Sequence, residues 1–403
     1  MLLVFSGCNN KTNTASQNRA SSNQSEAQIA SLVKSKESVN LDALKYDEVA
    51  IPKDYPSVAG IAVSGDTLFF CSGSDKPSKN TAPCLTYIEN LFSYNLKTKE
   101  LKTVATIDRG FIQIDWVNAD NDWVVYREIR DEYGGPGRIY AINRKSNAKT
   151  LVYEEKGCTN CKSVSSSHTF NLNLWGDFLV MPQVSFDATK KNKNGEVEDG
   201  IFHNSIKLLN LKTGKTKVIF SKASPLSLSG AIFSVSVNSS HLIFNYAEGG
   251  KQSIYIYSFD GGSLKDILDV PLRKDASGDN NYIMDKVLLT EDDCVIFDYP
   301  VNLQKNTFLK VIAPIENIKE MKSLPIKAPY YYLTFPQIEL KDYIVWANRK
   351  SDTLYILNRN SGCLKTIELG VGYMWIADGK LFIEGGLGFK ESFIIINLEK
   401  NEF

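Results

Sequence analysis

A repeat of about 52 residues constrains the fold of this chain more than any other feature, because self-similarity at a fixed period sets the architecture. Each copy begins with an apolar run, continues through a polar turn that usually contains Asp, and ends with a second apolar run. Seven copies occur, at residues 61–70, 115–126, 172–180, 235–244, 287–297, 338–346 and 375–383. This period lies in the range of β-propeller blades.

A second hairpin pattern follows the first within each period. It joins two β-rich runs through a turn of Asn, Lys, Ser, Thr and Gly. Clear copies occupy residues 93–105, 141–153, 208–220, 257–268 and 357–369, and a weaker copy occupies 312–324. Two hairpins per period give four antiparallel strands, and no long helical periodicity interrupts them. The sequence therefore predicts an all-β fold, a β-propeller of about seven four-stranded blades.

The last period is one strand short. After its first hairpin it offers only the run SFIIIN before the chain ends at Phe403. Residues 46–52, YDEVAIP, form an apolar segment that precedes the first complete copy and has no partner in the repeat. Because pairing the first strand with the last blade removes an open sheet edge, we expect an N-terminal strand to close the propeller. The propeller domain then covers residues 46–403.

Several runs resemble those of bacterial TolB-like and YncE-like propeller proteins. They are DWVVYRE at residues 122–128, YIVWANR at 343–349 and the NLKTGKTK turn at 210–217. The resemblance spans residues 46–403. It implies a propeller that serves as a scaffold or displays a ligand, and no catalytic residue is carried over from it.

The first eight residues, MLLVFSGC, resemble a bacterial lipobox, in which small residues precede a cysteine that becomes lipidated. The match departs from the usual pattern at Phe5, where Leu is common, and a basic n-region is missing. Of the 20 residues from 9 to 28, 14 are Ser, Thr, Asn or Gln, a composition too polar to fold. We therefore predict a signal segment at 1–8 with lipid attachment at Cys8, and a disordered tether over 9–45.

Charge and hydropathy limit the partners of the chain. Its 46 basic and 46 acidic side chains cancel, so no positive field favours nucleic acid. No run of 18 apolar residues is present to form a spanning helix. We expect an exported monomer, anchored by lipid to the outer face of the cytoplasmic membrane.

Six further cysteines remain, and their pairing is open. Cys158 and Cys161 form a CTNC loop, which fits a small loop disulfide, a redox pair or half of a zinc site. A zinc site would need a second ligand pair nearby, and a redox motif would need a strand before the pair and a helix after it. Neither context is visible, so a structural disulfide is favoured.

Motifs of enzymatic chemistry are absent from the sequence. There is no GxSxG elbow, phosphate loop or dinucleotide glycine pattern, so we predict no cofactor and no catalytic residue. The three histidines, His168, His203 and His241, lie on different repeats without metal-ligand spacing. The long insertion at 185–205 contains NKNGEVED, which fits a polar hairpin better than a calcium loop, and no metal is predicted.

Irregular segments cluster where the loops of one propeller face are expected. They include residues 127–138, 185–205, 349–352 and 385–390, with tyrosines at the blade entries. A charged and aromatic rim suits binding of a protein or cell-envelope ligand. The predicted contacts are Arg127, Arg130, Asp131, Tyr332 and Arg349.

Two other functions remain open. Asp131, Glu132 and Arg349 could form a carboxylate site at the channel mouth, as in a lyase or hydrolase that acts on carbohydrate or peptide. Alternatively, Cys158 and Cys161 could act as a thiol redox sensor.

Overall fold

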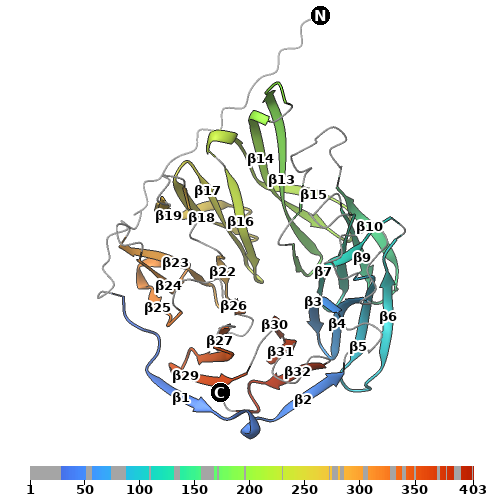
Figure 1. Cartoon of the computed structure of the whole chain (residues 1–403), viewed down its shortest axis with the longest axis vertical. Coiled ribbons are helices and arrows are strands. Elements are labelled where there is room, and N and C mark those ends of the chain that lie inside the picture. Colours follow the sequence, from blue (N-terminus) through green and yellow to red (C-terminus); the bar gives the residue numbers. More distant parts are fainter. Residues whose placement is uncertain are drawn as a thin grey trace, which may run out of the picture.

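The computed structural model describes the chain from residue 29 to residue 403 (Figure 1). The segments within this range that it does not describe are 51–56, 74–87, 109, 131–136, 156–167, 170–171, 195–196, 229, 272, 275–279, 282–285, 303–306, 327–332, 338–341, 349–350, 370–372, 378, 385–391 and 402.

The fold is a seven-bladed β-propeller. Seven antiparallel sheets follow one another around a ring, and within each sheet the chain moves from the centre outward. The innermost strands of successive blades contact one another, for example β3 with β7, and β3 also meets β30 of the last blade. The predicted architecture of seven four-stranded blades is confirmed.

The first four blades contain these strands: β3 (Ser57–Ser64), β4 (Thr67–Gly73), β5 (Asn90–Asn95) and β6 (Leu101–Thr106); β7 (Gln113–Ala119), β8 (Trp123–Ile129), β9 (Gly137–Asn143) and β10 (Lys149–Glu154); β12 (Asn173–Trp175), β13 (Phe178–Lys191), β14 (Val197–Asn210) and β15 (Thr216–Pro225), with β11 (His168–Thr169) also on β13; β16 (Ala231–Val237), β17 (His241–Glu248), β18 (Lys251–Ser258) and β19 (Leu264–Pro271). Their order along the chain is the order of the blades in the ring.

The last three blades contain these strands: β22 (Leu288–Leu289), β23 (Cys294–Asn302), β24 (Thr307–Pro314) and β25 (Lys322–Ser323); β26 (Leu333–Gln337), β27 (Tyr343–Asn348), β28 (Thr353–Asn358) and β29 (Cys363–Glu368); β30 (Tyr373–Ala377), β31 (Lys380–Glu384) and β32 (Ser392–Asn397). A small hairpin, β20 (Arg273–Lys274) with β21 (Asn280–Asn281), precedes blade 5. The described helices are 3₁₀ turns, Leu41–Ala43, Leu226–Leu228 and Ile318–Glu320. No helix in the described part is long and apolar enough to cross a membrane.

An N-terminal strand completes blade 7, as predicted. β2 (Tyr46–Ala50) pairs antiparallel with β32, and so supplies the outer strand that the last repeat lacks. Val49 on β2 is buried against Phe393 and Ile395, whereas its neighbours on β2 are exposed. This alternation is what a strand with one buried face requires. The first and last parts of the chain are thereby held in one sheet.

Residues 29–45 lie against the propeller, although the sequence pattern assigned them to the disordered tether. Ser31 bridges Ser323 of blade 5, and β1 (Ser35–Val39) pairs in parallel with β29 of blade 6. We call residues 29–45 the strap, because they follow the outside of blades 5, 6 and 7 (Figure 1). The strap is polar in composition, but β1 is held by backbone hydrogen bonds to an open sheet edge, which place little demand on side chains. Leu32 and Leu44 anchor it by burial.

The Asp that marks each repeat lies in the turn between the first and second strands. In blades 1, 2 and 3 it forms an ion pair with a Lys in the turn between the third and fourth strands of the same blade. These pairs are Asp66 with Lys97 at 2.5 Å, Asp122 with Lys145 at 2.7 Å, and Asp177 with Lys212 at 2.6 Å. Both turns therefore share one face of the ring, which we call the turn face. The connections between blades lie on the opposite face, the connection face.

Neighbouring blades are joined by apolar packing and by polar contacts on the turn face. Phe70 of blade 1 packs against Phe393 of blade 7, with ring centroids 5.5 Å apart. Trp123 of blade 2 donates its indole N–H to Asp177 of blade 3 at 3.1 Å. Burial of such aromatic side chains contributes about 1.5 to 3 kcal/mol each, so the blade junctions form the core of the ring.

The insertion at residues 185–205 is a long hairpin. β13 and β14 continue their pairing as far as Lys191 and Val197, well beyond the strands of other blades (Figure 1). Phe186 and Phe202 face each other across it, with ring centroids 4.7 Å apart. This segment therefore forms the polar hairpin that the sequence favoured.

Candidate functional site

Two of the predicted rim residues, Arg127 and Arg130, are in the described part of the structure. Arg127 lies on β8 and Arg130 directly follows that strand, near the connection face, where loops were expected to form a binding rim. The other predicted residues lie outside the described residues; they are Cys8, Asp131, Glu132, Cys158, Cys161, Tyr332 and Arg349. Their roles stay predictions.

Arg127 is engaged within its own blade. Its guanidinium forms an ion pair with Asp115 of β7, in which Nε lies 2.9 Å from Oδ1, and it lies 4.0 Å from the Glu155 carboxylate. Glu155 also accepts the backbone N–H of Gly137 at 2.9 Å. Only 15% of the Arg127 side chain is exposed. This arginine therefore positions strands of blade 2, and its predicted contact with a partner is untested.

Arg130 belongs to a charged patch at the junction of blades 1 and 2. Its guanidinium and that of Arg138 each lie 4.9 Å from the ring centroid of Phe111, which is buried beneath them. Both arginines also contact the Glu154 carboxylate, at 3.7 Å and 2.9 Å. Cation–π stacking and a shared carboxylate hold the two guanidinium planes in place. About half of the Arg130 side chain remains exposed, at 48%.

Asp108 and Lys149 extend this patch. The Asp108 carboxylate lies 3.5 Å from Arg138 and 3.8 Å from Lys149, and the Lys149 ammonium lies 4.0 Å from the Tyr140 ring centroid. We call Asp108, Phe111, Arg130, Arg138, Lys149 and Glu154 the rim patch. It offers three cations and two carboxylates over an aromatic base, a composition that suits recognition of a polar surface.

Glu128 lies fully buried behind the rim patch, on the side of blade 2 that faces blade 1. Neither carboxylate oxygen has a partner of normal hydrogen-bond geometry among the described residues, although the Asp108 backbone is close enough to stabilise the anion. Burial raises the pKa of Glu128 to about 7; the Asp108 carboxylate adds to this, and Lys149 and Arg138 oppose it. The Glu128 carboxyl group therefore gains or loses its proton near neutral pH.

The histidines serve structural contacts where they are described. His241 lies at the start of β17, and its Nδ1 is 2.8 Å from Asp293 of blade 5, so it joins two blades on the turn face. His203 Nε2 lies 2.9 Å from Asp187 on the exposed hairpin. Within the described ranges, no cluster of three or more His, Cys, Asp or Glu residues could hold a metal ion.

The described cysteines are separate thiols. Cys71, Cys294 and Cys363 are unpaired in the structure, and burial raises the pKa of the Cys71 thiol well above its usual value. A thiol with a raised pKa is a poor nucleophile at neutral pH. Cys71 therefore does not offer a reactive thiolate.

Sequence reasoning missed most of the rim patch. Arg130 was predicted from its place in the irregular segment 127–138. Arg138 belongs to the same segment but was not singled out, and Phe111 and Glu154 stand in or beside strands that look ordinary in the repeat. A usable signal was present, because Arg138 and Glu154 lie where the third and fourth strands of blade 2 reach the connection face, and Phe111 lies in the connection that enters this blade.

Comparisons with known proteins agree with the fold and go no further. No protein-family model and no curated protein matches the chain. Among solved structures, an acylaminoacyl peptidase from Pyrococcus horikoshii gives a TM-score of 0.50 at 11% identity, over 85% of this chain and 51% of that one. At this low identity, the similarity shows only that the two proteins share the propeller fold.

Two other similar structures have lower TM-scores. Virginiamycin B lyase from Staphylococcus aureus gives 0.48 at 12% identity, over 88% of this chain and 99% of that chain. TolB from Acinetobacter baumannii gives 0.35 at 12% identity, over 76% and 59% of the two chains.

Proposed function

We propose that this protein is a lipid-anchored binding module, which presents the connection face of its propeller to a protein of the cell envelope. The observation that carries the proposal is the rim patch, where two arginines are stacked on Phe111 and share Glu154. The described residues show no competing arrangement of catalytic groups.

The geometry of the patch suits a protein partner. A guanidinium fixed by stacking and by an ion pair loses little side-chain entropy when it binds, so its planar donors contribute more of their interaction energy. The mixed charges of Asp108, Arg130, Lys149 and Glu154 favour a partner that also carries both signs. The opposite face differs, because in blades 1, 2 and 3 its turn Asp and Lys residues are already paired within the blade.

The rim patch can be tested by capturing partners from native membranes with the tagged full-length protein. Replacing Arg130 by Ala is expected to weaken capture of the partner by about 1 to 3 kcal/mol, or roughly five- to hundredfold, without unfolding the protein. Quantitative mass spectrometry of the captured protein measures the change, and circular dichroism checks the fold.

Lysines of the turn face provide matched controls. Lys97→Ala, Lys212→Ala and Lys215→Ala remove exposed charges of similar size from the opposite side of the ring and are expected to leave capture unchanged. If these variants lose the partner while Arg130→Ala retains it, the functional face has been assigned to the wrong side.

The anchor is a separate part of the proposal and rests on the sequence around Cys8. The strap leaves the ring at Ile29, beside the outer strand of blade 5, and residues 9–28 precede it as a polar leash. A lipid on Cys8 would therefore hold the ring by its outer rim and leave both faces accessible.

Cys8→Ser tests the anchor. The full-length protein, expressed with a complete signal segment, is expected to incorporate labelled palmitate and to fractionate with membranes. The variant should incorporate none and appear in the soluble fraction. Unchanged fractionation of Cys8→Ser would reject lipid attachment at this residue.

A further inference from the structure

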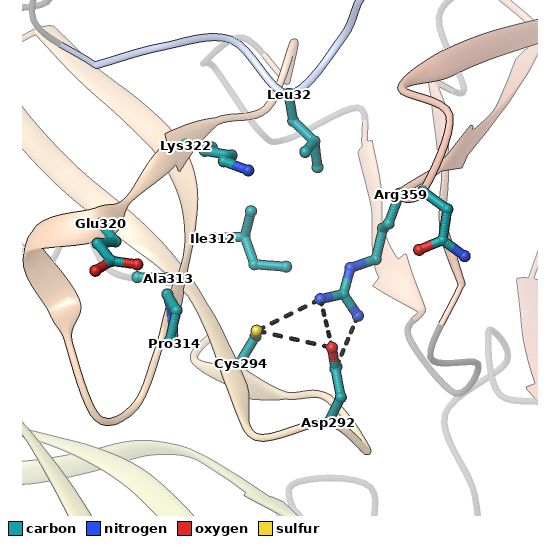
Figure 2. A pocket seen from close by; sticks show the side chains of 10 residues that line it. Leu32, Asp292, Cys294, Ile312, Ala313, Pro314, Glu320, Lys322 and Arg359 are labelled. Atoms are coloured by element: carbon teal, nitrogen blue, oxygen red, sulfur yellow. Dashed lines mark hydrogen bonds and ion pairs between the residues drawn. The ribbon is translucent and has the colours of Figure 1, made fainter.

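A cavity of about 210 Å³ lies between blades 5 and 6 on the turn face, covered by the strap (Figure 2). Its lining combines segments far apart in the sequence: Leu32 of the strap, Asp292 and Cys294 of the first hairpin of blade 5, Ile312, Ala313, Pro314, Glu320 and Lys322 of its second hairpin, and Arg359 and Asn360 of blade 6. A space of this size accommodates about seven water molecules at roughly 30 Å³ each, or an organic molecule of about eight non-hydrogen atoms.

One wall of the cavity carries a fixed guanidinium. Arg359 donates two hydrogen bonds to the carboxylate of Asp292, at 2.7 and 2.9 Å, and approaches the Cys294 sulfur at 3.4 Å (Figure 2). Although burial opposes it, the hydrogen bonds from Arg359 lower the pKa of Asp292, so this pair is charged at neutral pH. Burial raises the pKa of Cys294, which keeps its thiol neutral. The wall thus has a positioned cation whose charge is balanced by Asp292.

A second cation enters from the strap side. Lys322 extends its ammonium group into the space between Leu32 and Arg359, and no interaction joins it to the other lining residues (Figure 2). Glu320 lies on the side away from Arg359, where its carboxylate accepts a hydrogen bond from Asn317 at 2.8 Å. Lys322, an exposed residue, is therefore the cation among the described lining residues that forms no ion pair with a carboxylate of the lining.

Part of the remaining lining is apolar, beside the polar Glu320 and Asn360. Ile312 forms the floor of the cavity, and Leu32, which is 8% exposed, forms its roof. An inorganic anion would contact the two cations but would leave this surface covered only by water. A ligand that has both an anionic head and a short hydrocarbon chain satisfies both parts of the lining.

We propose that this cavity binds a small monocarboxylate with a short apolar chain. The carboxylate lies between the Lys322 ammonium and the Arg359 guanidinium, and the chain packs against Ile312 and Leu32. The site is on the face opposite the rim patch and does not depend on the function proposed for that patch.

Binding at this site is coupled to the strap, because Leu32 forms part of it. The Leu32 backbone N–H donates to the Ser323 carbonyl at 2.9 Å, and the Ser323 N–H donates to the Ala30 carbonyl at 2.8 Å. A ligand beneath Leu32 stabilises only the closed strap. At a ligand concentration of about ten times Kd, opening of the strap is expected to become about tenfold rarer.

Titration of the full-length protein with hexanoate tests the proposal. Saturable binding, measured by ligand-observed NMR, is expected for hexanoate, and much weaker binding is expected for 1-hexanol and for inorganic phosphate. Hydrogen exchange followed by mass spectrometry is expected to slow about tenfold in residues 29–34 under saturating hexanoate. Lys322→Met, which keeps an apolar stem but removes the charge, is expected to weaken hexanoate binding by about tenfold or more.

Lys319→Met provides the matched control, because Lys319 is an exposed lysine of the same segment that does not line the cavity. It is expected to bind hexanoate as the unmodified protein does. The proposal is overturned if hexanoate fails to bind, if 1-hexanol or phosphate binds equally well, or if Lys322→Met binds with unchanged affinity. Slower exchange in the rim patch instead of the strap would also overturn it.

Discussion

Deletion of residues 1–50 is expected to lower the melting temperature by roughly 5 °C or more, whereas deletion of residues 1–28 leaves it unchanged. The longer deletion removes β2 and so opens blade 7. It breaks the pairing of five residues with β32, exposes Phe393 and Ile395, and removes the buried Val49. At about 1 kcal/mol for each lost hydrogen bond and about 2 kcal/mol for Val49, the loss exceeds about 4 kcal/mol.

Side-chain contacts around β2 add to this loss. Ser392 donates its hydroxyl to Glu48 at 2.6 Å, and Asn401 both accepts from the Lys45 N–H at 2.9 Å and donates to the Lys45 carbonyl at 3.0 Å. These contacts fix the register of β2 on β32. Deletion of residues 1–40, which removes β1 but keeps β2, is therefore expected to give an intermediate melting temperature.

Point variants separate the effect of β2 itself on stability from the effect of deleting a longer segment. Val49→Ala removes a buried side chain of β2 and is expected to destabilise the protein by about 1 to 3 kcal/mol. Asp47→Ala alters an exposed residue on the same strand and is expected to have almost no effect. Calorimetry of the three deletions and two variants makes the comparison. Equal melting temperatures for deletions 1–28 and 1–50 would show that β2 does not close the ring.

The fold could be predicted because its signals are local and repeated. Each hairpin carries its own alternation and turn residues, so seven weak copies together specify one architecture. The closing strand was also predictable, since the last repeat was one strand short and residues 46–52 were left over. The Asp at the turn was visible in sequence, but its ion pair with a Lys 23 to 35 residues later is a contact between two turns.

The strap and the cavity could not be predicted in the same way. β1 has the sequence SKESV, which is as polar as the tether before it, and its pairing depends on an open edge supplied by β29. The cavity needs Leu32, Asp292 and Arg359 to meet, although Leu32 is more than 200 positions from the other two and these are 67 positions apart. Such sites form only when the ring closes and the strap lies against it. No local sequence pattern predicts these long-range contacts.

Glu128 makes the stability of the ring depend on pH. Its pKa is about 7 in the folded protein and near 4.5 when the chain is unfolded. The folded state therefore holds this proton more tightly than the unfolded state does. Between pH 4.5 and pH 7 the free energy of unfolding falls as pH rises, and above pH 7 a destabilisation of about 3 kcal/mol is fully developed.

Glu128→Gln is expected to remove this dependence. At pH 4 to 5 the amide resembles the protonated carboxyl, so variant and unmodified protein should be about equally stable. At pH 8 the variant should be more stable by about 2 to 3 kcal/mol, because no charge is buried beside Asp108. Urea unfolding at several pH values measures the difference.

Glu154→Gln is the matched control for this comparison. Glu154 lies in the same blade and contacts Arg130 and Arg138, but 47% of its side chain is exposed. An exposed ion pair contributes about 0 to 1 kcal/mol, and no rise in stability with pH is expected when it is removed. If the stability of Glu128→Gln follows the same pH curve as the unmodified protein, Glu128 is not buried as a titrating carboxyl. If the two curves separate above pH 6, ionisation of Glu128 destabilises the junction beneath the rim patch within the range of physiological pH.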